Sequence, residues 1–218
     1  PTLTKKQRHK LRVQQVRRQK IFLTCLFLLI VGCILLRFSK FSGRQKETHQ
    51  INAACEAYRD EVSSEAAQYD MSDYVDLILA VMMQESSGQG TDPMQSSEGA
   101  YNTRYPQQPN GITDPSYSIS CGIQELKYAL EKAVCTGPTD LSKIRLALQA
   151  YNFGADSYFA YLEENGQTVW TAQSAQAFAQ MASGGTQRDE DDPLHDPAGP
   201  WDYGDQYYPD HVLRYYHL

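Results

Sequence analysis

The sequence lacks acidic residues over its first 46 positions, although these positions carry 12 of the 20 Lys and Arg residues. Residues 47–218 have the opposite deficit, with 8 basic residues against all 26 acidic ones and a formal charge of −18. Because phosphate binding needs a basic face, this shortage argues against nucleic acid as a partner of the larger part. No Cys-x-x-Cys motif occurs, so zinc binding and thioredoxin-type chemistry have no support.

An uncharged apolar run of sixteen residues, 21–36, interrupts the basic part. Its length is close to the lower limit for a bilayer span, about 17 residues, and its flanks can extend it. We expect residues 21–38 to form a single-pass anchor in the cell membrane, preceded by a basic cytoplasmic tail, residues 1–20, and followed by a linker, residues 39–52. Eight basic residues precede the run and four follow it, which favours an inside N-terminus and an extracellular domain over residues 53–218.

Two other interpretations of the apolar run stay open. A secretory signal peptide would be cleaved after the run, but no A-x-A-like site follows Leu36. The segment Ile30-Val31-Gly32-Cys33 resembles a bacterial lipobox, which would make Cys33 a lipidated N-terminus, but the run continues past Cys33. All three interpretations place the acidic part of the chain outside the cytoplasm.

Three cysteines, Cys55, Cys121 and Cys135, lie beyond the apolar run, so they cannot all pair within one chain. If one helix spans about residues 118–135, Cys121 and Cys135 lie about 21 Å apart along it. A disulfide needs Cα atoms about 4.4–6.8 Å apart, which excludes this pair on one helix.

The acidic part is predicted to be mostly α-helical, since apolar residues recur at helical spacing and no strand alternation or internal repeat is present. Helix starts are indicated by Ser72 before Asp73, by Asp114 before Pro115, and by Thr139 or Asp140. The expected helices cover residues 53–68, a segment from Asp73 to about Glu85, a segment from Pro115, a segment ending before Gly154, and residues 155–165 and 171–182. Two long loops, residues 86–113 and 186–200, separate helices, and loops of this length are often functional.

Glu85 continues the apolar stripe of its predicted helix, because Val75, Ile78 and Met82 precede it at spacings of three and four. It also stands at the C-terminal end of that helix. Burial and the negative end of the helix dipole both disfavour a charged carboxylate, so we expect a raised pKa. Such a group can donate a proton to a glycosidic oxygen near neutral pH. The alternative is a Glu that turns into solvent at a fraying helix end.

Four segments that follow in order carry a family resemblance. They read Gln84-Glu85-Ser86-Ser87-Gly88, Asp92-Pro93-Met94-Gln95-Ser96-Ser97-Glu98, Asp114-Pro115 leading to Gly122, and Ala150-Tyr151-Asn152-Phe153-Gly154. This order resembles the lytic transglycosylase and goose-type lysozyme superfamily. It is most similar to the CwlT-like lysozyme domains of cell-wall hydrolases carried by conjugative elements of Gram-positive bacteria. The resemblance implies a lysozyme-like helical domain over residues 53–218.

The resemblance also implies residue roles. Glu85 would be the general acid, Ser86 its neighbouring hydrogen-bond partner, and Gln95 a substrate contact. Tyr151 and Asn152 would hold the acid and a sugar. Because Tyr151 lies on the apolar stripe of its helix, we expect its ring beside Glu85 and its hydroxyl on the carboxyl group, although a plain core tyrosine fits the same position.

The reaction outcome stays open because Asp92-Pro93 replaces the Gly-Leu of transglycosylases. Hydrolysis with inversion needs a second carboxylate that activates water, and Asp92, Glu98 and Asp114 are the nearest candidates. Asp92 as a loop residue and Asp114 as a helix cap are the alternatives. A transglycosylase needs no second carboxylate, since the sugar 6-hydroxyl closes an anhydro ring. The acidic segment 189–196 lacks the Gly and terminal Glu of a calcium loop, so no metal or other cofactor is expected.

The sequence thus predicts a membrane-tethered enzyme that cleaves the β-1,4 bond between N-acetylmuramic acid and N-acetylglucosamine in peptidoglycan. The resemblance implies local wall opening for a conjugation or type IV secretion apparatus. The alternative is a catalytically inactive module that binds peptidoglycan and anchors a secretion channel.

Overall fold

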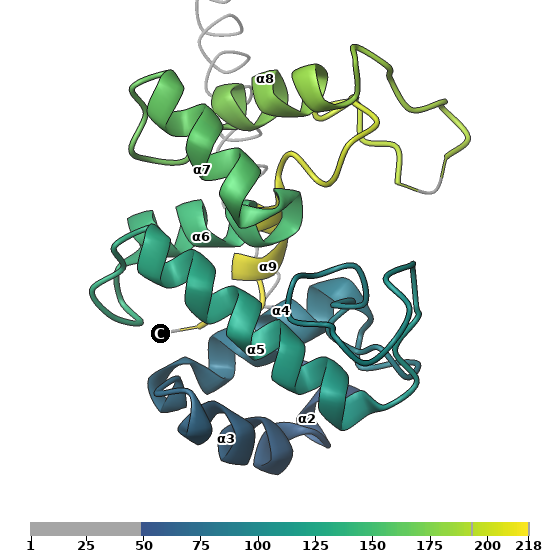
Figure 1. Cartoon of the computed structure of the whole chain (residues 1–218), viewed down its shortest axis with the longest axis vertical. Helices are drawn as coiled ribbons and strands as arrows, with labels where there is room; N and C mark the ends of the chain where they lie inside the picture. The colour runs from purple at the N-terminus through teal and green to yellow at the C-terminus, as the bar shows by residue number, and fades with distance from the viewer. Residues whose placement is uncertain (1–48, 193, 218) are drawn as a thin grey trace, which may run out of the picture. The chain divides into compact units, whose positions relative to one another are not determined.

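The computed structural model describes residues 49–192 and 194–217, which form a mostly helical domain (Figure 1). Over these residues the helices are connected without strands, apart from one isolated bridge between Gln187 and Trp201. The helical elements are α2 (Ala53–Glu56), α3 (Arg59–Gln68), the 3-10 helix η1 (Ser72–Tyr74), α4 (Val75–Glu85), α5 (Pro115–Lys132), α6 (Leu141–Phe153), α7 (Ala155–Glu164), α8 (Ala172–Ala182) and α9 (Tyr208–Leu213). The predicted fold class, mostly α, is confirmed.

The predicted tail and anchor, residues 1–20 and 21–38, lie outside the described residues, as does most of the linker. Among the residues that are described, none of the helices has the length and apolar character needed to cross a bilayer.

Several helix ends follow local sequence chemistry. Asp114 caps α5 by accepting hydrogen bonds from the backbone N–H groups of the next turn, and Asp140 caps α6 in the same way. Gly154 ends α6 with a φ of 85°, a left-handed value that glycine adopts at no steric cost. The predicted starts at Pro115 and after Asp140 are therefore confirmed.

Two helix predictions were wrong in detail. The segment 53–68 is divided into α2 and α3 at Ala57 and Tyr58, and Asn52 caps the first piece by accepting from the Cys55 N–H. Ser72 does not cap α4, because it begins the 3-10 turn that leads into the helix at Val75. A short 3-10 helix that the apolar pattern did not indicate thus precedes α4.

The core surrounds α4, whose residues from Leu77 to Met82 are all fully buried. Helices α3 and α9 pack against α4, and α6 contacts α5, α7 and α9. A helix that is buried on every side has no face that must turn to solvent, so its position is set by packing against its neighbours. As a result, the C-terminal end of α4 is held against α9, two segments more than 120 residues apart in the sequence (Figure 1).

The three cysteines of this domain are free thiols, and Cys55 and Cys121 are buried. Cys121 lies within α5, whereas Cys135 follows the end of that helix. The sequence-based exclusion of a bond between these two is consistent with this arrangement.

Candidate active site

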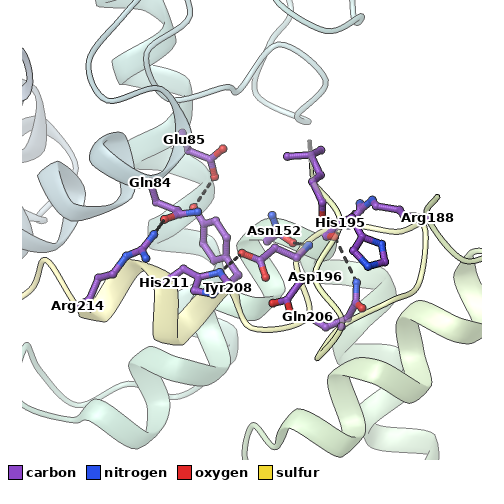
Figure 2. Close-up of a pocket in the computed structure, with 14 residues that line it drawn as sticks. Gln84, Glu85, Asn152, Arg188, His195, Asp196, Gln206, Tyr208, His211 and Arg214 are labelled. Carbon is purple, nitrogen blue, oxygen red and sulfur yellow. Dashed lines mark hydrogen bonds and ion pairs between the residues drawn. The ribbon is translucent and has the colours of Figure 1, made fainter. Parts of the chain in front are cut away.

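A cavity of about 490 Å³ lies where the end of α4 meets the start of α9 (Figure 2). Gln84 and Glu85 contribute from α4, and Asn152 contributes from the end of α6. The remaining lining residues come from the long segment between α8 and α9, from α9 itself and from Arg214 directly after α9. Three parts of the sequence thus converge on Glu85.

Glu85 is the last residue of α4 and is half-buried in this cavity. Its Oε1 accepts a hydrogen bond from the hydroxyl of Tyr208. The pKa of Glu85 is raised to about 7, and burial is the largest cause. The Tyr208 hydrogen bond works in the opposite direction, and the charges of nearby carboxylates, Asp205 first among them, add to the rise. A carboxyl group with this pKa exists in both protonation states near neutral pH, as a general acid requires.

The predicted hydrogen bond between Tyr151 and Glu85 was wrong. The Tyr151 hydroxyl donates instead to the backbone carbonyl of Met94, at 2.9 Å. Its ring stacks against Tyr208 with 6.3 Å between ring centroids, and Tyr208 supplies the hydroxyl that reaches the acid. Tyr208 therefore has the role that was predicted for Tyr151, and Tyr151 supports the ring of Tyr208.

Asn152 lines the cavity, but its side-chain oxygen already accepts a hydrogen bond from the protein backbone. Its Oδ1 accepts a hydrogen bond from the backbone N–H of Asp205 at 2.7 Å. A Cβ at Gly204, the preceding residue, would fall 2.6 Å from the same oxygen, and Gly204 has a φ of 48°. Glycine at this position therefore allows the segment before α9 to approach the end of α6.

Ser86 and Gln95, two predicted site residues, do not line the cavity. The Ser86 hydroxyl donates to the carbonyl of Pro93 at 2.8 Å, which fastens the loop after α4 to the helix end. Gln95 is exposed and donates to the carbonyl of Asp92 and to Asn110 Oδ1. In this arrangement both residues hold the loop rather than face Glu85.

Asp92 is buried inside the same loop, with 2% of its surface exposed. Its carboxylate accepts hydrogen bonds from the backbone of Ser96 and Ser97 and from the hydroxyls of Ser97 and Ser118. A carboxylate whose acceptor positions are filled by four donors has little capacity left for a water molecule. Asp92 therefore acts here as an internal anchor of the loop.

The other two candidates for a second carboxylate also lie away from the cavity. Glu98 is exposed on a turn, and Asp114 is the cap of α5, with Oδ1 bonded to the N–H groups of Ser116 and Tyr117. The structure thus places none of Asp92, Glu98 and Asp114 in the lining of the cavity that holds Glu85.

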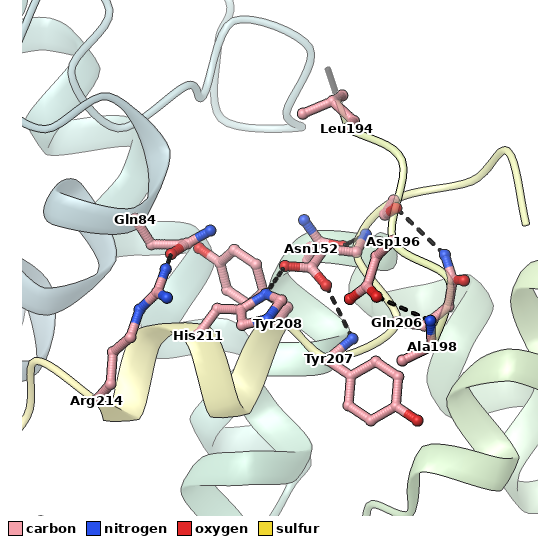
Figure 3. A network of polar contacts seen from close by, with 12 residues as sticks. Gln84, Asn152, Leu194, Asp196, Ala198, Gln206, Tyr207, Tyr208, His211 and Arg214 are labelled. Atoms are coloured by element: carbon pink, nitrogen blue, oxygen red, sulfur yellow. Dashed lines mark hydrogen bonds and ion pairs between the residues drawn. The ribbon is translucent and has the colours of Figure 1, made fainter. Parts of the chain in front are cut away.

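The segment around the start of α9 supplies residues that the sequence reasoning missed. Asp205 and His211 line the cavity, and Asp205 Oδ2 lies 2.6 Å from His211 Nδ1. Figure 3 shows His211 on α9 in the network of polar contacts at this site. The Asp205 carboxylate raises the pKa of His211, which favours the protonated imidazole. No motif marks these residues, because they meet Glu85 only through tertiary packing.

The acidic segment 189–196 forms turns that use their own carboxylates. Asp192 accepts from the N–H of Leu194, and Asp196 accepts from the N–H of Ala198. Within residues 49–192 and 194–217, no three His, Cys, Asp or Glu side chains are grouped as a metal site would require. Backbone capping therefore accounts for these two carboxylates.

This helical domain, with a protonatable Glu at the end of its central helix, has the character of a lysozyme-like protein. The chain belongs to the lysozyme-like family, whose model matches residues 53–216. It is 35% identical to the bifunctional muramidase/DL-endopeptidase CwlT of Bacillus subtilis over 169 residues, which cover 78% of this chain and 44% of that protein. The predicted resemblance to CwlT-like lysozyme domains is thereby confirmed.

Other relatives match over about half of their length. The chain is 40% identical over 115 residues to the uncharacterized membrane protein YocA of Bacillus subtilis, covering 51% of this chain and 45% of YocA. It is 37% identical over 110 residues to the pneumococcal vaccine antigen A homolog of Streptococcus pyogenes serotype M1, half of each chain. A crystal structure from Staphylococcus aureus, described as similar to a lipoprotein of the NLP/P60 family, superposes with a TM-score of 0.64 at 28% identity, covering 78% of this chain and 55% of that one.

Proposed function

We propose that this protein is a muramidase that cleaves the β-1,4 bond between N-acetylmuramic acid and N-acetylglucosamine in peptidoglycan, with Glu85 as the general acid. The observation that carries the proposal is the position of Glu85, half-buried in a cavity of about 490 Å³ and with a pKa raised to about 7. The relative CwlT is named a muramidase, which supports the substrate class.

In the proposed reaction, the protonated Glu85 carboxyl gives its proton to the glycosidic oxygen as the bond to C1 breaks. General acid catalysis of this kind contributes about 10²–10⁴-fold to a rate. Tyr208 orients the carboxyl through its hydroxyl and is itself buried and stacked on Tyr151. The acid therefore rests on a rigid support and not on a flexible side chain.

We also propose a location for the enzyme, which rests on the sequence. Residues 21–38 would tether it to the cell membrane with the catalytic domain outside, and the name of YocA as a membrane protein is in keeping with a tether. In this position the enzyme would open the wall locally. The sequence resemblance suggests that the opening serves a conjugation or secretion apparatus.

The experiment compares the full chain in detergent with its Glu85→Gln variant on purified peptidoglycan, with mass spectrometry of the products. Glu85→Gln should lower cleavage by at least 10²-fold because it removes the proton donor and keeps the shape. Glu163→Gln, at an exposed position of α7, is the matched control and should cleave like the wild type. Wild-type protein that binds the wall without cleaving it would favour the inactive binding module, and a fully active Glu85→Gln variant would refute the assigned acid.

A further inference from the structure

Asp205 is the carboxylate that shares the cavity with Glu85 and is held by the most contacts. Its backbone N–H donates to Asn152, its Oδ1 accepts from the Tyr207 N–H at 2.9 Å, and its Oδ2 lies 2.6 Å from His211 Nδ1. The side chain is still 28% exposed, so it stays accessible from the cavity. Such a side chain is both oriented and accessible to a ligand or a water molecule.

Asp205 and Glu85 belong to different segments of the chain, as two groups on opposite sides of a substrate would. It approaches the cavity from the segment before α9, whereas Glu85 approaches from the end of α4. Asp196, another carboxylate at this cavity, accepts a hydrogen bond from the Ala198 N–H, and its charge acts on His211 more weakly than that of Asp205 does. Asp205 instead has His211, an imidazole that can compensate a change in its charge.

We propose that Asp205 is the second catalytic carboxylate, the base that activates water for hydrolysis with inversion. This inference rests on the proposed function, with Glu85 as the acid. It assigns to Asp205 the role for which the sequence suggested Asp92, Glu98 and Asp114.

The step is balanced in atoms and charge. Glu85 transfers its proton to the glycosidic oxygen, and the bond between that oxygen and C1 breaks. A water molecule attacks C1 from the opposite face and gives one proton to the Asp205 carboxylate as the new C1–O bond forms. The enzyme is left with an ionised Glu85 and a protonated Asp205, and exchange with solvent restores both. Inverting glycosidases hold their two carboxyl groups about 6.5–9.5 Å apart, which leaves room for the attacking water.

The first test needs no variant. Inversion at a β-linked sugar produces the α-anomer first, which proton NMR detects before mutarotation when the wild-type chain cleaves soluble peptidoglycan oligomers. We expect α-anomeric reducing ends. Products that begin as the β-anomer, or that carry 1,6-anhydro ends, would overturn the assignment of Asp205 and would leave the assignment of Glu85 intact.

The second test removes the base and supplies a substitute nucleophile. Asp205→Asn should reduce hydrolysis by about 10²–10⁴-fold. Azide needs no base, so with this variant it should restore bond cleavage and give products ending in an α-azido sugar. A residue that only held the fold would not produce this signature. Asp210→Asn, a surface position of α9 paired with Arg145, is the control and should keep wild-type hydrolysis without an azide product.

The outcomes separate the two proposals. If Asp205→Asn hydrolyses like the wild type, Asp205 is not the base. The same conclusion follows if the variant keeps the wild-type melting temperature, loses hydrolysis and is not restored by azide. An unfolded variant leaves the decision to the anomer measurement. Failure of the proposed function is recognised separately, because Glu85→Gln would then be as active as the wild type.

Discussion

Replacing Tyr208 by Phe should move the fall in activity at high pH upward by roughly one pH unit. The Tyr208 hydroxyl donates to Glu85, and this hydrogen bond lowers the pKa of a carboxyl group that burial raises. Phe keeps the buried ring and removes only the donor. The free energy of a hydrogen bond is about 1.5–3 kcal/mol to a charged group and about 0.5–1.5 kcal/mol to a neutral one. The difference, about 1–1.5 kcal/mol, corresponds to roughly one pKa unit.

The direction of the shift follows from the role of Glu85. A general acid works in its protonated form, so cleavage should decline as the pH rises through the Glu85 pKa of about 7. Loss of the Tyr208 donor destabilises the ionised form and raises this pKa. The variant should therefore keep its activity to a higher pH than the wild type does.

The assay is the initial rate of clearing of a peptidoglycan suspension between pH 5 and pH 9, at substrate concentrations far below saturation. Tyr216→Phe is the matched control, because it removes a hydroxyl that donates to the Pro138 carbonyl at 2.9 Å, outside the cavity. Its pH profile should coincide with that of the wild type. A Tyr208→Phe profile that also coincides with the wild type would refute the reasoning, either because Glu85 is not the titrating acid or because the hydroxyl does not act on it.

Two further predictions concern the loop after α4 and its support. Asp92→Asn should lower the free energy of unfolding by about 1–3 kcal/mol, because an amide cannot accept from all the serine donors that surround the carboxylate, and urea denaturation would measure this loss. Full stability with loss of cleavage would instead show that Asp92 acts on the substrate. Gly122→Ala should destabilise the domain by about 1–3 kcal/mol, since a Cβ there falls 2.6 Å from Met94 Cβ. Ser116→Ala, at the exposed start of α5, is its control in the same denaturation experiment, and equal stability of the two variants would contradict the predicted clash.

The sequence was informative where structure is decided locally. Apolar spacing predicted that Glu85 continues the buried face of its helix, and the structure places this residue at the end of α4. Asp114, Asp140 and Gly154 mark helix ends through hydrogen bonds and backbone angles that involve only their own turn. Such features depend on neighbours within about four residues and can therefore be read from the sequence.

The partners of Glu85 could not be predicted, because they depend on contacts across the whole domain. Tyr208 and Asp205 are about 120 residues away, and α9 has only six residues, too few for a periodic pattern. Tyr151 was expected to bond the acid because it lies on an apolar stripe, a pattern that fixes the side of the helix but not the partner of the hydroxyl. A second tyrosine stacked on Tyr151 takes that partner instead.

The end of α6 joins the two segments that build the site. Tyr151 donates to the carbonyl of Met94 in the loop after α4, and Asn152 accepts from Asp205 in the segment before α9. The next residue, Phe153, accepts a hydrogen bond at its carbonyl from the Tyr203 hydroxyl at 3.0 Å. Consecutive residues of one helix end thus set the positions of both neighbouring segments. The Ala-Tyr-Asn sequence therefore governs Glu85 through the segments that it holds, so substitutions there should alter the cavity even where no side chain of α6 touches the sugar.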